Sequence, residues 1–280
     1  MKKIVSISGG KTSAYLASNY KADDYVFALV RTSDHNCQFK DRKTAKIVED
    51  KIQREFVGTL EEDTIIYTIL DLEQHIGKRI NWVSGITFDE VVNEKGGMLP
   101  NKLHRYCTAQ MKILPIFEYW LNNYFDPVEM LIGFRANEHR RAVNMSKRVN
   151  KNGLLEQKYI CGKHKNGRNK WSVIEWQKPV FPLIEDAVFK ADIENYWAGK
   201  FVRFAELNNC VGCFHRSAQL LNYMASKHNE KLEWFASKEG GKKGFWKYPY
   251  SYRKIIDSHF SQTIDFKDES FCGSGYCGIN

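Results

Sequence analysis

The sequence has no long hydrophobic run, and this absence excludes a membrane-spanning segment. Its apolar stretches are only a few residues long, whereas a spanning helix needs about 20. Residues 1–5 begin like a signal peptide, but Gly9, Gly10 and Lys11 interrupt it before an apolar core forms. We therefore expect a cytoplasmic protein with no membrane partner.

The chain also lacks internal repeats, low-complexity tracts and a paired set of cysteines. Seven cysteines are an odd number, and without an export signal they indicate metal binding or thiol chemistry rather than disulfides. The 280 residues are 43% hydrophobic and 14% aromatic, which excludes a disordered chain and predicts a buried core.

The net charge of +9 is concentrated in one segment. Between Arg135 and Lys178 there are twelve Lys or Arg and three Glu, so this segment carries the whole excess and the rest of the chain balances. Such a stretch attracts the phosphates of nucleotides or nucleic acid. A merely solvated basic loop is the competing interpretation.

Hydrophobic spacing predicts alternating strands and helices, and hence an α/β fold with a parallel sheet covered on both faces. We expect a nucleotide-binding domain over residues 1–145. Residues 146–280 would form a basic insertion, with residues 150–170 as a loop or irregular insertion, and a C-terminal metal- or cluster-bearing region packed on that domain. The predicted strands are 4–7, 25–30, 64–67 and 130–133, and the predicted helices include 12–19, 39–56, 72–82 and 111–124.

A glycine-rich hexamer follows the first predicted strand and opens a helix. Glycines let the backbone approach a phosphate, and the unpaired N–H groups and dipole of the helix attract an anion. The lysine adds a full charge, and the other side chains add hydroxyls. The hexamer consists of Ser8, Gly9, Gly10, Lys11, Thr12 and Ser13.

Four segments in order along the chain resemble the phosphoadenylyl-sulfate (PAPS) reductase family. The hexamer is similar to the pyrophosphate loop of that family and of ATP pyrophosphatases, with Thr12 in place of the usual acidic residue. The other segments are Arg105-Tyr106-Cys107-Thr108 with Lys112 and Pro115, then Gly133-Phe134-Arg135 through Glu138 to Arg141, then residues 179–183 with Asp192 and Tyr196.

The resemblance implies a Rossmann-like domain of the adenine nucleotide alpha hydrolase type with a cysteine-bearing helical or irregular C-terminal extension. It implies that Ser8–Ser13 binds an adenine nucleotide, with Mg²⁺ open as its companion ion. Lys11 would form a polyphosphate or phosphosulfate clamp together with Arg135, Arg140 and Arg141, since arginine forks suit bidentate oxyanion contacts.

The cysteines divide between a metal site and a nucleophile. Cys210 and Cys213 form a Cys-x-x-Cys pair that can hold one metal centre. The resembling iron–sulfur reductases carry a further ligand where Cys107 stands. Cys272 is our fourth ligand for a 4Fe–4S cluster, with zinc as the alternative, although Cys277 could also take that place.

Three functions remain open from the sequence. The first is reduction of a sulfonucleotide to sulfite, with Cys277 attacking as in the family's tail, Lys11 at the nucleotide, and a thioredoxin-like reductant as partner. Tyr276 and Asn280 depart from that tail's Glu and His. The second is ATP cleavage to AMP and pyrophosphate for adenylation or thiolation of nucleic acid held by the 135–178 segment. The third is a non-catalytic nucleotide-binding subunit.

Overall fold

A six-stranded sheet forms the centre of the computed structural model, which describes residues 1–240, 244–247 and 249–258. The strand order is β3-β2-β1-β4-β6-β5. All neighbouring strands are parallel except β5 and β6, which form an antiparallel hairpin at one edge. The strands are β1 (Lys3–Ile7), β2 (Asp24–Ala28), β3 (Asn81–Val83), β4 (Val128–Leu131), β5 (Leu155–Lys163) and β6 (Asn169–Val180). The expected α/β fold with a mostly parallel sheet is confirmed.

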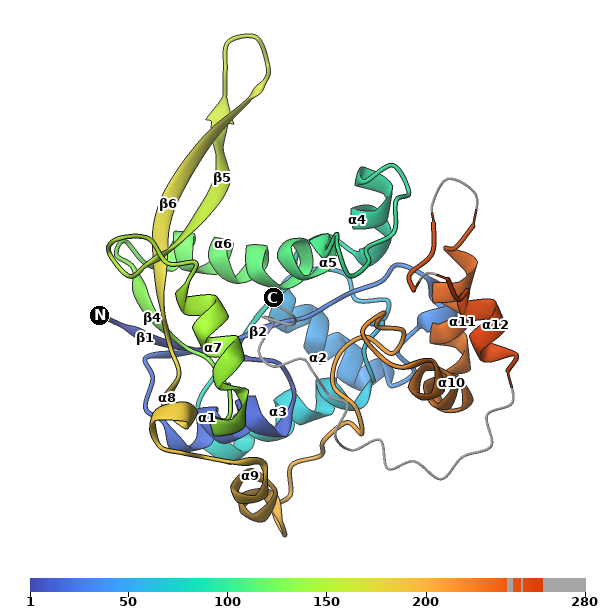
Figure 1. Cartoon of the computed structure of the whole chain (residues 1–280), viewed down its shortest axis with the longest axis horizontal. Coiled ribbons are helices and arrows are strands. Elements are labelled where there is room, and N and C mark those ends of the chain that lie inside the picture. The colour runs from blue at the N-terminus through green and yellow to red at the C-terminus, as the bar shows by residue number, and fades with distance from the viewer. Residues whose placement is uncertain (241–243, 248, 259–280) are drawn as a thin grey trace.

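Helices cover both faces of this sheet (Figure 1). One face carries α1 (Lys11–Asn19), α2 (Arg42–Ile52) and α3 (Thr64–Ile76), and α9 (Lys190–Trp197) packs against α1 on its outer side. The other face carries α6 (Leu114–Asn123) and α7 (His139–Ser146).

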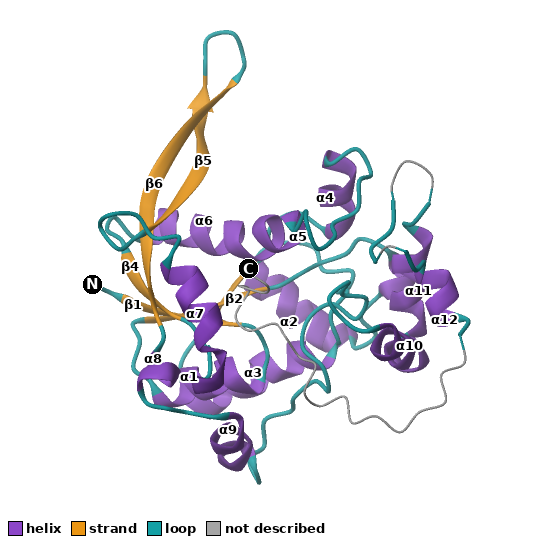
Figure 2. Ribbon diagram, viewed as in Figure 1, coloured by secondary structure: helices purple, strands orange, loops and turns teal. Residues whose placement is uncertain are grey.

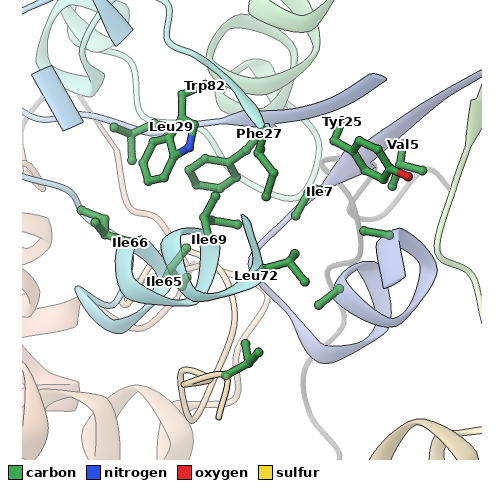
Figure 3. Close-up of a cluster of buried hydrophobic side chains, with 14 of the residues drawn as sticks. Val5, Ile7, Tyr25, Phe27, Leu29, Ile65, Ile66, Ile69, Leu72 and Trp82 are labelled. Atoms are coloured by element: carbon green, nitrogen blue, oxygen red, sulfur yellow. The ribbon is translucent and has the colours of Figure 1, made fainter. Parts of the chain in front are cut away.

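Alternating side chains of the central strands pack into two separate hydrophobic cores, one on each face of the sheet. Val5 and Phe27 point into the core with α1 and α3 (Figure 3). Ile4, Val26 and Ala28 belong to the core beneath α6 and α7. Because successive strand residues face opposite sides, near-continuous apolar runs are what a sheet buried on both faces requires.

A third core carries the later part of the chain. There α4 (Phe88–Glu94) meets α10 (Ala218–Lys227), α11 (Asn229–Ser237) and α12 (Tyr252–Ile256). Phe88, Trp234, Phe235 and Trp246 form its aromatic centre, with ring centroids 4.9–6.3 Å apart. This unit holds the segment that bears Cys210 and Cys213. The short elements are α5 (Tyr106–Thr108), α8 (Pro182–Glu185), the 3₁₀ turns His35–Cys37 and Ala136–Glu138, and the π-helical turn Ala109–Ile113.

The predicted strand at 64–67 is wrong, because these residues begin α3. Ile65, Ile66, Ile69 and Leu72 recur at helical spacing and all face the core with the sheet. β-Branched residues favour strands locally, but here the burial of this one face decides the outcome.

The predicted loop at 150–170 is also wrong, because most of it belongs to the β5–β6 hairpin. Lysine, asparagine and glycine are depleted in strands, which hid the hairpin. Residues 177–180 of β6 pair with β4, and the preceding part of β6 pairs with β5. The sheet therefore crosses residue 145, the expected domain boundary.

Candidate nucleotide and cysteine site

The strand order reverses between β1 and β4. From β1 the chain adds β2 and β3 on one side, whereas β4, β6 and β5 lie on the other. Ligands of open α/β sheets bind outside the carboxyl ends of the strands at such a switch point. Ser8–Ser13 follows β1 and Gly133–Arg141 follows β4, so the two expected nucleotide-binding segments flank this point.

Ser13 holds the glycine-rich loop in shape from within. Its hydroxyl accepts a hydrogen bond from the Ser8 N–H at 3.1 Å and donates to the Gly10 carbonyl at 3.0 Å. Gly9 has φ +79°, a left-handed conformation that glycine adopts without strain. Within the described residues no side chain caps the N-terminus of α1, so its first N–H groups face the place where an anion would bind.

Lys11 contacts α9 through both its side chain and its backbone. Its ammonium group forms an ion pair with Glu194 and lies 6.0 Å from the Phe204 ring centre. Trp197 donates its indole N–H to the Lys11 carbonyl at 3.0 Å. The structure thus places Lys11 and the half-buried Thr12 at the junction of α1 with α9.

Glu138 joins two of the three expected arginines. Its carboxylate accepts from Arg135 Nε at 3.0 Å and from an Arg141 terminal nitrogen at 2.5 Å. Burial opposes its ionisation, but the Arg141 charge and the bonds from Arg135 outweigh burial and hold the pKa of Glu138 below its usual range. The Arg141 guanidinium also lies 4.2 Å from the Phe134 ring centre. Arg140 is exposed on α7.

Three expected metal ligands line one small cavity of about 50 Å³. They are Cys107, Cys210 and Cys213. Burial, reinforced by the Cys213 charge, raises the pKa of the Cys107 thiol to about 11, and burial also raises the pKa of Cys210. Among the described residues no group of three or more His, Cys, Asp or Glu is arranged to hold a metal ion. Cys272 and Cys277 lie outside the described residues.

Two buried polar atoms at this cavity lack hydrogen-bond partners in the described part of the chain. They are Nε of Arg105 and Nε2 of His215, and both residues line the cavity. Burial, together with the charge of Arg105, lowers the pKa of His215 to about 4. A buried donor without a partner is costly, so this wall of the cavity suits an anionic or hydrogen-bonding ligand.

Lys112 connects the cysteine cavity with the nucleotide loop. It lines that cavity and also a second, smaller one at the end of β1, bordered by Ser6 and Ser8. Its ammonium group donates to the buried Glu61 at 2.8 Å, and the Lys112 side chain is itself only 12% exposed. Glu61 in turn forms an isolated β-bridge with Cys210. Lys112 belonged to a predicted motif, whereas no sequence signal indicated Glu61.

The segment before Cys210 lies directly against the glycine-rich loop. A Cβ added to Gly10 would sit 2.1 Å from the amide nitrogen of Asn208. Arg216 donates to the Asn208 carbonyl at 2.7 Å, and the Leu207 N–H donates to Glu62 at 2.8 Å. The loop and the cysteine cavity therefore belong to one continuous region.

The remaining described cysteines and another cavity lie apart from this region. Cys37 is buried, and burial raises the pKa of its thiol to about 12. Cys161 is exposed on β5. A larger cavity of about 450 Å³ lies between α6 and the β5–β6 hairpin, and none of the expected site residues that the structure describes lines it.

Of three comparisons with known proteins, the one with curated proteins gives a similar chain. No family model matches the chain, and no solved structure matches it significantly. Among curated proteins, the uncharacterized protein MJ0066 of Methanocaldococcus jannaschii is 25% identical over 215 residues, which cover 74% of this chain and 42% of that protein. The chain thus spans less than half the length of this relative. Within the described residues, no helix is both long and apolar enough to cross a membrane.

Proposed function

We propose that this chain is a PAPS reductase-like enzyme that binds an adenine nucleotide at the switch point and reduces its sulfonate to sulfite. The observation that carries the proposal is the position of Lys112, which borders both the end of β1 and the cavity of Cys107, Cys210 and Cys213. A nucleotide on the Ser8–Ser13 loop would thereby lie beside thiol chemistry. The adenine nucleotide alpha hydrolase type of fold belongs to this proposal.

The groups that would hold the nucleotide come from β1 and β4. The first N–H groups of α1 would bind its phosphates, and Gly9 and Gly10 allow a close approach. Glu138 fixes the guanidinium groups of Arg135 and Arg141 beside this point, so that their forks are preorganised for an oxyanion. Lys11 would join them when an anion competes with Glu194 for its charge.

Three thiols line the cysteine cavity, and thiolates are ligands of both zinc and iron–sulfur clusters. Cys107, Cys210 and Cys213 would hold a 4Fe–4S cluster or zinc together with Cys272, which lies outside the described residues. Either group would stabilise thiolates that burial otherwise keeps protonated. The Arg105 guanidinium beside them would hold a nearby sulfonate or phosphate.

The proposed reaction uses the Cys277 thiolate as nucleophile. Its sulfur would attack the sulfonate sulfur, the bond from that sulfur to the phosphate oxygen would break, and the nucleotide would leave with the bonding electrons. A thioredoxin-like dithiol would then reduce the enzyme S-sulfonate, releasing sulfite and becoming a disulfide. Cys277 lies outside the described residues.

The test is anaerobic sulfite release from PAPS and from adenylyl sulfate with reduced thioredoxin. Cys277→Ser should abolish sulfite release and leave nucleotide binding intact. Cys161→Ser, which changes an exposed thiol on β5, should behave as wild type. Absence of sulfite from metal-loaded wild-type protein would contradict the proposal.

Metal content supplies an independent readout. Iron, labile sulfide and zinc are measured in the wild type and in Cys107→Ser, Cys210→Ser and Cys213→Ser. Each variant should lose most of the metal, whereas Cys161→Ser should keep it. Wild-type metal content in all three variants would remove these cysteines from the metal site.

A second candidate is ATP-dependent adenylation of nucleic acid, favoured by the basic side chains of the β5–β6 hairpin. It requires pyrophosphate release from ATP that depends on added nucleic acid. Pyrophosphate without sulfite would select this candidate. Turnover of either nucleotide would contradict a purely non-catalytic subunit.

A further inference from the structure

The outer end of the β5–β6 hairpin projects beyond the rest of the molecule (Figures 1 and 2), while nearer its base Tyr159 packs against Phe117 of α6. Strand β4 pairs only with residues 177–180 of β6. The preceding part of β6 pairs with β5 alone. The part of β6 before its pairing with β4, residues 169–176, has eight residues. At about 3.3 Å each they extend roughly 25 Å, so the hairpin is a two-stranded ribbon on the scale of a nucleic-acid groove. We call residues 157–174 the arm.

The arm is positively charged along its whole length. It contains five Lys or Arg residues and no Asp or Glu. All five basic side chains are exposed. They are Lys158, Lys163, Lys165, Arg168 and Lys170. With no acid inside the arm to neutralise them, they form a surface complementary to a polyanion.

The arm also presents apolar side chains to solvent. Ile160 lies opposite Trp171, and Lys158 lies opposite Val173, so these four side chains share one face of the ribbon. Ile160, Trp171 and Val173 are 49%, 53% and 57% exposed. The Lys158 ammonium lies 5.0 Å from the Trp171 ring centre. Large apolar side chains gathered on one exposed face indicate a binding surface.

We propose that the arm binds double-stranded DNA by entering its major groove. The major groove of B-form DNA is about 12 Å wide and admits a two-stranded β-ribbon. The basic side chains would reach the phosphates on both walls of the groove. Ile160 and Val173 would meet the methyl groups of thymine on its floor. The major groove of A-form RNA is too narrow for such a ribbon.

This inference does not depend on the nucleotide site, so it is tested without any nucleotide. Binding of the full chain to a short fluorescein-labelled duplex is followed by anisotropy between about 50 and 200 mM salt. The test variant is Lys163→Gln/Lys165→Gln/Arg168→Gln. It should weaken binding at least about tenfold and reduce the slope of log affinity against log salt by about 3, since each lost phosphate contact removes about 0.9.

A matched control removes the same three charges elsewhere. Lys21→Gln/Lys40→Gln/Lys43→Gln changes exposed residues outside the arm and should keep both the affinity and the salt slope. Equal losses in the two triple variants would reduce the effect to net charge and overturn the inference. Single-stranded DNA that binds as tightly as the duplex would overturn insertion into the groove.

The tryptophans supply a second readout that does not rely on charge variants. Six of the seven tryptophans are at most 5% exposed, and Trp171 is 53% exposed. Acrylamide should therefore quench mainly Trp171, and duplex DNA should suppress that quenching. In Trp171→Phe the DNA-dependent change should disappear. Acrylamide quenching that duplex DNA leaves unchanged would overturn the inference. A full chain that binds no duplex at low salt would also overturn it, and would leave the arm as a protein-docking surface.

Discussion

Two glycines with the same left-handed backbone have different surroundings. Gly9 has φ +79° and Gly153 has φ +75°. A Cβ on Gly9 would lie 2.6 Å from Cγ2 of Ile65, whereas a Cβ on Gly153 would meet no atom within 4 Å. The first site therefore demands glycine for two reasons, the backbone conformation and the packing of α3 against the nucleotide loop. The second demands it for the backbone alone.

We predict that Gly9→Ala destabilises the protein more than Gly153→Ala. The shared backbone cost is about 1–2 kcal/mol, and overpacking against Ile65 adds about 1–3 kcal/mol. Urea denaturation of both variants measures the difference. Equal losses would mean that Ile65 moves aside freely.

Asp89 is a carboxylate that the fold keeps charged. Burial opposes its ionisation, but the Thr32 hydroxyl at 2.7 Å, the Ser33 N–H at 3.1 Å and the Lys238 ammonium at 3.2 Å outweigh burial and lower its pKa. The Trp234 indole also donates to it at 3.2 Å. One side chain thereby ties α4 to α11.

A lowered pKa makes this contribution to stability pH-dependent. It is present above the unfolded pKa of about 3.9 and is lost as the pH falls through the folded value. Asp89→Asn should cost about 1–3 kcal/mol at neutral pH, and the difference from wild type should shrink below about pH 4. Urea denaturation across this pH range measures it. The exposed Asp257→Asn should shift stability by less than about 0.5 kcal/mol, and a gap for Asp89→Asn that stays constant with pH would contradict the assignment.

At the scale of elements, α9 reaches the nucleotide loop through one tryptophan. Trp197 is 5% exposed, donates to the Lys11 carbonyl and packs against His75 and Phe204. We predict that Trp197→Ala destabilises the fold by about 3–5 kcal/mol and weakens nucleotide binding. Trp197→Phe, which keeps most of the packing, should cost about 1 kcal/mol.

Trp171→Ala is the matched control for this prediction, because it removes the same side chain from an exposed strand. It should change stability by less than about 0.5 kcal/mol. Thermal denaturation and nucleotide titration are measured on all three variants. Normal nucleotide binding by a folded Trp197→Ala variant would show that α9 does not support nucleotide binding by the loop.

The sequence predicted the elements that local residues specify, and it failed where packing against distant segments decides the structure. β1, α1 and β4 were predictable because apolar runs and a glycine-rich turn mark them locally. The start of α3 was not, since Ile65 and Ile66 favour a strand until the burial of one face is known. The β5–β6 hairpin was missed because its lysines and asparagines oppose strand formation. Its partner strand β4 also lies far from it in the sequence, so no local signal indicates the pairing.

At the scale of the whole molecule, the site joins segments that are distant in sequence. Motifs indicated Ser8–Ser13, Cys107 and the Cys210–Cys213 pair, but their order along the chain does not say that they meet. The contact of Gly10 with Asn208 and the buried pair of Lys112 with Glu61 bring them together. Glu61 could not be predicted, because only the fold gives it a partner.

The Lys112–Glu61 pair allows the joined site to be tested apart from folding. The two side chains are 12% and 2% exposed, so Lys112→Met leaves Glu61 as an unpaired buried charge. This change should cost about 3–5 kcal/mol. Adding Glu61→Gln removes that charge and should recover much of the stability, as urea denaturation will show.

Recovery of stability should not restore function in this double variant. If Lys112 supplies positive charge to both the nucleotide loop and the cysteine cavity, the refolded double variant still lacks that charge. Its nucleotide affinity and turnover should stay at least about tenfold below wild type, equivalent to 1.4 kcal/mol. Wild-type affinity and turnover in the stable double variant would show that the pair only supports the fold, and that the loop and the cysteines act separately.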